Sequence, residues 1–540
     1  MNEDRVISMR RRELLRLFGS GGVAALAGMP ALEALAQSRK DTLVIGMDTS
    51  DTVNLDPVRD LHYTPPMTVS TCYDGLVTMT PGDYVTLKPA LATKWARTPD
   101  GMGWRFTLRD NVRFVSGNPM TAHDVKFSLD RVRYIRYQAA QYLTNVTSVN
   151  VVDDKTVDIM LKNQSEPLLN TLAAPSFSIT DRKVVESQGG DASPDSKTKD
   201  KATDWLNQQS AGTGPYRLAG WLRNSQIQFT ANPNYWGSKP AFQRIVIRHF
   251  EDGAAQMLAL RRGDIDVAFN MLPEQINSMK AEKDVWIARH ASLDFVYLAL
   301  THNPEFNKAL ANKYARQAIA YAIDYDGIRD SLLGGAATRS ASFIPVGSLG
   351  STDELTREIG FRQDLARSKK ALAQAGMPEG FEFDVIYGNS IIAGTSYHVL
   401  AQKLQSDLAR VGIKMKLSPL PHVNLRTAYS GGKMSAVITY WNPPAVESAL
   451  WGWATVQRVA KRLHWTPPES LVKLVDQAAA ETDQKKQVVL WRQYQVAMVD
   501  EANLIVLFQP IYQVGVRKTI KDFPLTAAGW QADLGDVKPA

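Results

Sequence analysis

The most informative stretch of this sequence runs from Thr98 to Val132 and reads TPDGMGWRFTLRDNVRFVSGNPMTAHDVKFSLDRV. In its first part, apolar residues such as Trp104 and Phe106 alternate with polar ones, which is the period of a strand with one buried face. In its second part, Thr121 stands three residues before Asp124, the spacing of a helix-capping box with Asp in place of the usual Glu. The stretch therefore predicts a hairpin, a turn and a helix, and it contains no pattern typical of catalysis.

The same stretch resembles, almost residue by residue, a block of the peptide/nickel class of solute-binding proteins, family 5, which serve ABC importers. Further blocks follow in the order and spacing of that family: YDGLV at Tyr73–Val77, GTGPYRLAGW at Gly212–Trp221, NPNYWG at Asn232–Gly237, LRRGDID at Leu260–Asp266 and ARQAIAYAID at Ala315–Asp324. The resemblance covers nearly the whole chain after its N-terminal segment. The glycines of GTGPY predict a tight turn between strands, because neither the P-loop nor the Rossmann spacing is present.

The composition independently indicates an exported, soluble α/β protein. With 540 residues and 44% hydrophobic composition the chain can bury a large core, and its length predicts two or three domains. The formal net charge of +7 is mild for this size, and Lys and Arg are dispersed, which argues against nucleic-acid binding. The single cysteine, Cys72, excludes a disulfide within the chain and a cysteine-based metal site, and we expect it to be a buried thiol.

Residues 1–36 have the features of a twin-arginine signal peptide. Arg11 and Arg12 open an RRx pattern, a Gly- and Ala-rich apolar run follows, and Ala34-Leu35-Ala36 is a cleavage site of the A-x-A type. No lipobox cysteine follows, so cleavage before Gln37 is expected to release a free periplasmic protein. No later stretch approaches the roughly eighteen apolar residues of a membrane span, so no transmembrane helix is expected.

The resemblance implies an α/β fold of the periplasmic-binding-protein-like class (type II, cluster C), with two lobes and a discontinuous first lobe. The expected division is 37–290 for lobe I, including an extra subdomain at about 58–210, then 291–508 for lobe II and 509–540 for the return to lobe I. The polar segment 189–203 is expected to be a surface loop. Proteins of this resemblance trap a solute by hinge closure, and an ABC permease in the inner membrane reads the closed form. A monomer is expected.

The sequence offers no motif for catalysis or metal binding. It lacks HExxH, an EF-hand loop and a convincing nucleophile elbow. The eight histidines are dispersed, with no pair at i, i+3 or i+4. We therefore predict a binding protein rather than an enzyme, with no catalytic residue, no metal ligand and no cofactor.

The segment expected to line the cleft is Ala436–Pro444, where an apolar strand ends in a polar aromatic turn. Flat indole rings suit a sugar ring, an aromatic compound or a cationic headgroup. For Trp451 and Trp465, a place in the core of lobe II is at least as well supported as one in the cleft. The predicted substrate-binding residues are Trp441, Tyr440, Asn442, Asn389, Tyr73 and Trp453.

The resemblance also suggests what the solute is not. In relatives that carry peptides, the turn after this strand holds an aspartate for the peptide amino group, and an arginine for the carboxylate follows the strand equivalent to Phe383–Tyr387. Here Asn442 is the nearest polar residue in the turn, Glu447 is the first acid downstream, and Asn389 stands near the second position. Both charged anchors are therefore absent by this alignment, which argues against a short zwitterionic peptide.

The predicted function is an extracytoplasmic receptor that traps a peptide-like or other small organic solute and delivers it to a membrane permease. Three alternatives remain open. A metal-chelate or nickel carrier of the same family would bind in a metal-dependent manner. A periplasmic chaperone or peptide scavenger would bind peptides broadly, and a secreted hydrolase would need a nucleophile with a paired base.

Overall fold

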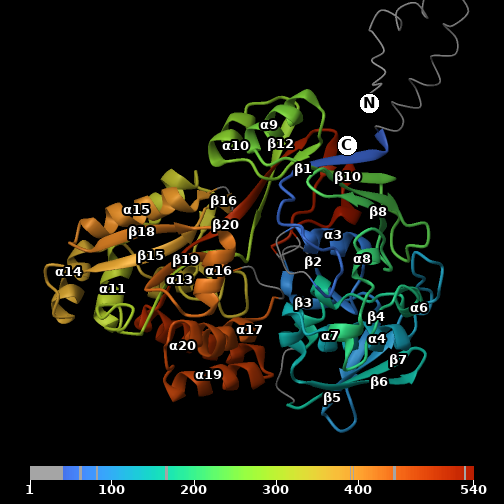
Figure 1. The fold of residues 1–540 in the computed structure, drawn as a ribbon, viewed down its shortest axis with the longest axis horizontal. Coiled ribbons are helices and arrows are strands. Elements are labelled where there is room, and N and C mark those ends of the chain that lie inside the picture. The colour runs from blue at the N-terminus through green and yellow to red at the C-terminus, as the bar shows by residue number, and fades with distance from the viewer. Residues whose placement is uncertain are drawn as a thin grey trace, which may run out of the picture.

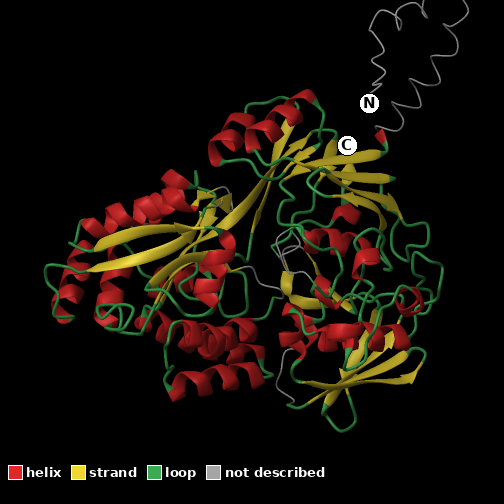
Figure 2. Ribbon diagram, viewed as in Figure 1, coloured by secondary structure: helices red, strands yellow, loops and turns green. Residues whose placement is uncertain are grey.

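The computed structural model of the chain describes residues 40–59, 64–80, 83–163, 168–389, 391–392, 395–441, 446–527 and 531–540. The expected signal peptide and Asn442 lie outside these residues. Figures 1 and 2 show two bodies of mixed helix and strand, joined in the upper centre by extended strands. Within the described parts of the chain, none of the helices combines the length and the apolar character that a bilayer crossing requires.

One 12-stranded sheet runs through both lobes. On the lobe I side it contains β1 (Thr42–Met47), β8 (Tyr216–Leu222), β9 (Gln226–Ala231), β10 (Arg244–His249), β11 (Val267–Ala268) and β12 (Val285–Ala291). On the lobe II side it contains β13 (Phe295–Leu300), β14 (Ala337–Thr338), β15 (Glu382–Gly388), β18 (Lys414–Leu420) and β19 (Ala436–Trp441). With β20 (Leu504–Arg517), the order is β18-β15-β19-β13-β20-β11-β1-β10-β9-β8, and β12 and β14 also pair with β20.

Strand β20 connects the two halves of this sheet (Figure 1). Its first half pairs with β13, and its second half pairs with β11 and β12. In the middle, the carbonyl of Pro510 accepts a hydrogen bond from the Ser292 backbone N–H at 3.0 Å. The chain thus crosses between the lobes at two places that lie together, once between β12 and β13 and once within β20.

Strand β13 shows why this part of the sequence is apolar without alternation. All six of its residues are buried, because helices cover both faces of the sheet (Figure 2). Val296 and Leu298 pack in one cluster with α15 (Tyr397–Ala409), and Phe295 and Tyr297 pack in a second cluster with α16 (His422–Ser430). The two faces of β13 therefore pack into two separate hydrophobic cores.

The other helices of lobe II surround these two cores. They are α11 (Lys313–Ala322), α12 (Tyr325–Gly327), η3 (Ile328–Leu332), α13 (Asp353–Ile359), α14 (Leu365–Gln374), α17 (Ser448–Trp453), η4 (Ala454–Val459), α18 (Ala460–Arg462), α19 (Glu469–Ala480) and α20 (Gln484–Glu501). Trp451 and Trp465 lie in the second core, 1% and 6% exposed. Both residues therefore have the structural role that the sequence left open for them.

The extra subdomain is built on an antiparallel sheet of β4 (Ala92–Arg97), β5 (Gly103–Leu108), β7 (Thr156–Leu161) and β6 (Val146–Asp153). Helix α4 (Ala122–Ile135) packs on this sheet through Val125, in one core with Phe106. The Thr121 backbone N–H and hydroxyl donate to the Asp124 carboxylate at 2.8 and 2.9 Å. Strands β4 and β5 pair antiparallel on either side of the turn at 98–102, so the predicted hairpin, turn and capped helix are confirmed.

The expected surface loop at 189–203 is wrong at its C-terminal end. Residues Ser196–Lys199 form the short helix α7, and Asp200 follows with its side chain fully buried. The guanidinium of Arg131, also fully buried, donates to Asp200 at 2.7 Å and to Asp56 at 2.7 Å. The segment is drawn inward because two carboxylates are needed to satisfy one buried guanidinium.

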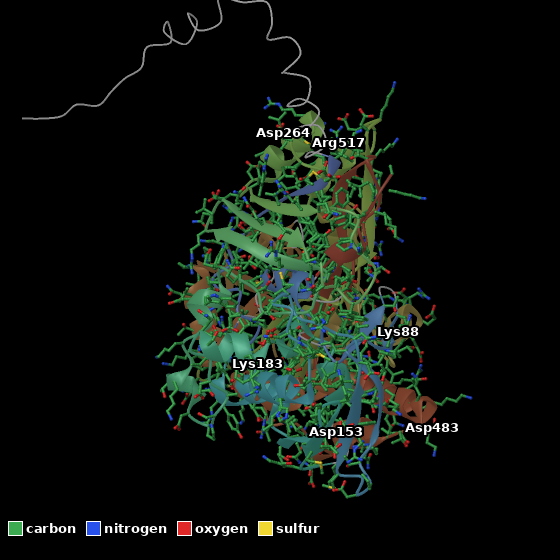
Figure 3. The ribbon with its side chains drawn as sticks, turned by 90° about the vertical axis from the view of Figure 1, so that its right-hand side faces the viewer. Lys88, Asp153, Lys183, Asp264, Asp483 and Arg517 are labelled. Atoms are coloured by element: carbon green, nitrogen blue, oxygen red, sulfur yellow. The ribbon has the colours of Figure 1, made fainter. Side chains whose placement is uncertain are left out.

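Lobe I is completed by α3 (Pro65–Cys72), α9 (Gly253–Arg262) and α10 (Pro273–Met279). Cys72 at the end of α3 is buried, as predicted. Figure 3 shows Asp264, which follows α9, close to Arg517 at the end of β20. The Arg517 guanidinium donates to the carbonyl of Leu260 at 3.2 Å, so this end of β20 is held by lobe I.

Short elements complete the fold. They are β2 (Val77–Thr80), β3 (Asp83–Pro89), η1 (Gln138–Leu143), α5 (Leu168–Thr171), η2 (Pro175–Phe177), α6 (Arg182–Ser187), α8 (Thr203–Leu206), β16 (Ile391–Ile392), β17 (Thr395–Ser396), β21 (Ile520–Asp522), η5 (Leu534–Asp536) and β22 (Lys538–Pro539). The tyrosine on β3, Tyr84, donates or accepts a 3.0 Å hydrogen bond with His290 of β12. The hairpin of β2 and β3 is thereby tied to the crossing region.

Candidate functional site: the cleft between the lobes

A cleft of about 1120 Å³ lies between the lobes, beside the two crossings. Lobe I, lobe II and β20 all contribute to its walls. From lobe I come Asp48, Asp51, Glu251, Asp252, Phe269 and Asn270; from lobe II come Val423, Arg426, Thr427, Ser430 and Tyr440; from β20 comes Tyr512. A cavity shared in this way changes shape whenever the lobes rotate about their connection.

The lobe I wall is made by loops at the carboxyl ends of parallel strands. Because β1 is parallel to β10 and to β11, these strand ends meet at one edge of the sheet. Asp48 follows β1, Glu251 follows β10 and Asn270 follows β11. The Asp48 backbone N–H donates to the Asn270 side-chain carbonyl at 2.8 Å, and the Asn270 N–H donates to Gln256 at 3.1 Å. Loops more than two hundred residues apart in the chain are thereby joined into one wall.

Asp51 lies further along the loop after β1. Its carboxylate accepts a hydrogen bond from the Thr64 backbone N–H at 2.8 Å, and the Thr64 hydroxyl donates to the Asp48 carbonyl at 3.3 Å. The loop is therefore folded onto the start of α3, and the half-buried Asp51 carboxylate is held at the cleft.

The lobe II wall repeats this arrangement. Strand β15 is parallel to β18 and β19, so their carboxyl ends also meet at one edge. Helix α16 follows β18 and turns Val423, Arg426, Thr427 and Ser430 to the cleft, at the i, i+3, i+4, i+7 spacing of one helix face. The opposite face of α16 is buried in the second core.

Charged groups from both lobes act on the phenol of Tyr440, near the end of β19. Burial raises the pKa of the Tyr440 phenol to about 12; the charges of Asp294 and Asp51 act in the same direction, and Arg426 opposes them. Asp294 lies at the crossing and accepts a hydrogen bond from the Tyr512 hydroxyl at 2.5 Å. Tyr440 therefore stays protonated and can both donate and accept a hydrogen bond within the cleft.

Trp441 faces away from this cleft. Successive residues of a strand point to opposite faces, and Tyr440 packs at the edge of the first core whereas Trp441 packs at the edge of the second. The Trp441 ring lies edge-on to Phe343 at 5.1 Å between centroids, and the Arg458 guanidinium lies 4.8 Å from its centre. Its indole N–H has no hydrogen-bond partner among the described residues. A role of Trp441 in binding remains a prediction.

The other predicted site residues are scattered. Asn389 is exposed at the carboxyl end of β15, where its N–H donates to the Leu420 carbonyl at 3.3 Å. Tyr73 is buried in the core of lobe I, and its hydroxyl accepts a hydrogen bond from the Ala211 N–H at 3.2 Å. Trp453 lines a separate cavity of about 430 Å³. Of the five predicted residues that the structure describes, Tyr440 alone lines the cleft between the lobes.

The second cavity lies between the subdomain and lobe II. Trp453 donates to Asp476 at 2.9 Å on one side of it, and the Arg458 guanidinium donates to the Gln141 side chain at 2.5 Å across it. Tyr142 of the subdomain completes this contact. Trp453 therefore lies at the contact between the subdomain and lobe II, and not in the cleft beside the crossings.

Sequence reasoning missed most of the polar residues of the cleft. Asp48, Asp51, Glu251 and Arg426 carry no local motif, and the alternation of β1 and β10 predicts only that strands end there. One signal was available. Ligands of open α/β sheets bind at the carboxyl ends of parallel strands. The loop after each predicted parallel strand is therefore a candidate part of the site, in the same way as the loop after β19.

Comparison with known proteins places the chain in a family. The model of the bacterial extracellular solute-binding proteins, family 5 middle region, matches residues 86–458. The probable D,D-dipeptide-binding periplasmic protein DdpA of Escherichia coli K12 is 29% identical over 493 residues, which covers 90% of this chain and 91% of the relative. The dipeptide-binding protein of the same organism is 25% identical over 469 residues, with 82% and 84% covered.

Solved structures support the same fold. The ABC transporter-associated periplasmic binding protein DppA from Helicobacter pylori, in complex with the peptide STSA, superposes with a TM-score of 0.76. At 22% identity the match covers 93% of this chain and 99% of the other. The predicted two-lobe α/β fold of periplasmic binding proteins is therefore confirmed, and because the family model spans more than half of the sequence, the chain belongs to the bacterial extracellular solute-binding proteins of family 5.

Proposed function

We propose that this protein is the periplasmic receptor of an ABC importer, which captures a peptide-like or other small organic solute between its lobes and delivers it to the permease in the inner membrane. The observation that carries the proposal is the cleft of about 1120 Å³ whose walls come from both lobes. Pockets that bind drug-sized ligands commonly have volumes of about 300–1,000 Å³. The cleft lies slightly above this range, so it has room for a solute larger than a single amino acid. The protein binds and releases its solute without changing it.

The proposed division is lobe I from residues 37–290 and 509–540, and lobe II from 291–508, with the hinge at the two crossings. Rotation there moves α16 and Tyr440 relative to the loops after β1 and β10. A solute that contacts both walls binds the closed form more tightly than the open form, and this difference in affinity shifts the population toward closure. The permease then recognises the closed form.

Export is proposed to use residues 1–36 as a twin-arginine signal, so that the protein reaches the periplasm folded. The relative DdpA bears a periplasmic name, which supports this location. We expect the exported protein to begin at Gln37, to be a monomer, and to be retained in the cytoplasm when Arg11 and Arg12 are both replaced by Lys. N-terminal sequencing of the periplasmic fraction tests the cleavage site.

The test of the binding function is a thermal-shift screen of the protein from Gln37 onward against peptides, opines, sugars, betaines, aromatic acids and metal chelates. A solute that binds only the folded protein at a hundredfold excess over its Kd stabilises it by about 2.7 kcal/mol. Titration calorimetry then gives the Kd for each compound that shifts the midpoint.

Two variants locate the bound solute. Tyr440→Phe removes only the hydroxyl and is expected to weaken binding by about twofold to tenfold, the effect of one hydrogen bond. Tyr314→Phe makes the same change on an exposed tyrosine of α11 and should leave the Kd unaltered. Equal affinities of the wild type and Tyr440→Phe would place the solute elsewhere, and hydrolysis of a compound in the same wells would favour an enzyme instead.

A further inference from the structure

The charge of the cleft is opposite to that of the molecule. The whole chain carries a formal charge of +7, with 62 Lys and Arg against 55 Asp and Glu. The described lining of the cleft contains four carboxylates, those of Asp48, Asp51, Glu251 and Asp252, and one basic side chain, that of Arg426. A basic protein therefore encloses an acidic cavity.

The acidic side chains all come from lobe I. Asp48 and Asp51 lie on the loop after β1, and Glu251 and Asp252 lie on the loop after β10. Because β1 and β10 are adjacent parallel strands, the two loops lie next to each other and their charges add in one region.

Three of these carboxylates, those of Asp48, Glu251 and Asp252, have no Lys or Arg partner among the residues that the structure describes. His249 approaches two of them, at 3.7 Å from Asp48 and 3.7 Å from Glu251. Among the described residues, no group of three or more His, Cys, Asp or Glu side chains is arranged to hold a metal ion. An organic cation is the partner that fits such a wall, because separate ammonium or guanidinium groups can meet separate carboxylates.

Arg426 stands on the opposite wall, on the exposed face of α16. Within the described structure its guanidinium has no ion pair or hydrogen bond with a protein group. Arg426 and Tyr440 of lobe II line the same cleft as the four acids of lobe I. A solute at Tyr440 therefore has negative charge on one side and a single positive charge on the other.

We propose that the cleft selects solutes of net positive charge, whose amine or guanidine groups meet the carboxylates of Asp48 and Glu251 on lobe I while one anionic or polar group meets Arg426 on lobe II. This inference rests on the proposed receptor function and narrows its substrate class. It differs from recognition by anchors in the turn after β19, since the cation is held by the other lobe. Closure about the hinge brings the two charged walls onto one solute.

The test compares solutes that are matched in shape and differ in charge. Ala-Lys, Ala-Gln and Ala-Glu form a peptide series, and agmatine with 4-guanidinobutanoate forms a pair without a peptide bond. Titration calorimetry with the wild-type protein is expected to give the tightest binding for Ala-Lys within the series and for agmatine within the pair. Affinity for the cations should fall as NaCl rises from about 0.05 to 0.5 M, since ions screen partly exposed charges.

Three variants separate the two walls. The double variant Asp48→Asn/Glu251→Gln keeps the hydrogen-bonding capacity at both positions and removes two charges. It should weaken binding of the cations by about twofold to fivefold for each partly exposed charge removed. Arg426→Gln should weaken Ala-Lys, which loses the partner of its carboxylate, and should not weaken agmatine, which has no anionic group and is repelled by Arg426. Glu379→Gln, an exposed acid in the turn before β15, is the control and should change nothing.

The outcomes distinguish this inference from the proposed function. If Ala-Gln or Ala-Glu binds as tightly as Ala-Lys, or if the double variant retains the preference, the charge selection is wrong and the receptor function stands. If no member of either set binds, while a neutral or anionic compound from the wider screen does, the same conclusion follows. If nothing in the screen binds at all, both are wrong.

Discussion

Replacing Arg131 by Met is expected to destabilise the subdomain of lobe I strongly. The Arg131 side chain is fully buried and donates four hydrogen bonds of 2.6 to 2.9 Å, two to Asp56 and two to Asp200. Both carboxylates are also fully buried. Met fills much of the volume but leaves two buried negative charges without their main partner.

The size of the effect follows from what remains. Removing one partner of a buried ion pair costs about 3–5 kcal/mol. Arg59 lies 3.3 Å from Asp200 and 3.6 Å from Asp56, with its side chain 23% exposed, so it compensates part of the lost charge. The free energy of unfolding should therefore fall by about 3 kcal/mol, the lower end of that range.

Urea unfolding measures the change in the free energy of unfolding. The transition is monitored both by far-UV circular dichroism and by tryptophan fluorescence, because a protein of several domains need not unfold in one step. The matched control is Arg105→Met, which breaks a two-bonded pair between Arg105 on β5, whose side chain is 41% exposed, and Asp158 on β7. The control should unfold at nearly the wild-type urea concentration. If Arg131→Met unfolded together with Arg105→Met, the account of Arg131 as the centre of a buried ion-pair network would be refuted.

Three further outcomes are expected. Burial alone would raise the pKa of Asp200, but its bonds to Arg131 lower it, so the stability that this pair contributes is present above the unfolded pKa of about 4 and is lost as the pH falls through the folded value; acid titration of the unfolding midpoint should show this loss in the wild type and not in Arg131→Met. Gly214→Ala should destabilise by about 1–3 kcal/mol in the same urea assay, because its Cβ would come within 2.5 Å of the Cys72 carbonyl carbon, whereas a Cβ at Gly220 meets nothing within 4 Å and Gly220→Ala serves as the control. Tyr512→Phe removes the donor to Asp294 at the crossing and should cost about 1–3 kcal/mol; unaltered stability together with an unaltered scattering profile in solution would show that this bond does not hold the hinge.

The sequence predicts the local structure correctly where a single buried face of a strand or a single helix-capping residue determines it. The alternation around Phe106, the Thr121–Asp124 capping box and the continuous apolar run of β13 all lead to the elements observed. Resemblance to the family then provides the order of these elements. Neither the local sequence nor the resemblance predicts that Asp200 is buried, because its partner is the guanidinium of Arg131, 69 residues earlier in the chain.

The cleft was less predictable because its residues meet only after both lobes have folded. The Asp48 N–H and the Asn270 side chain, one hydrogen bond apart, are separated by 222 positions in the chain. One part could have been read from the sequence alone. Tyr440 and Trp441 are neighbours on a strand, so at most one of them could point toward any one face, and the core around Phe343 takes the tryptophan.

Strand β20 has a consequence for the order in which this protein can fold as it is made. It is the last strand of the large sheet along the chain, yet it lies in the middle of that sheet and borders both β13 and β11. A ribosome that has produced all the other strands has still left both lobes with an open central edge. Multidomain chains commonly complete an N-terminal domain early during synthesis, but neither lobe of this protein can complete the large sheet before β20 has been made. The two lobes must acquire their final sheet together, near the end of translation.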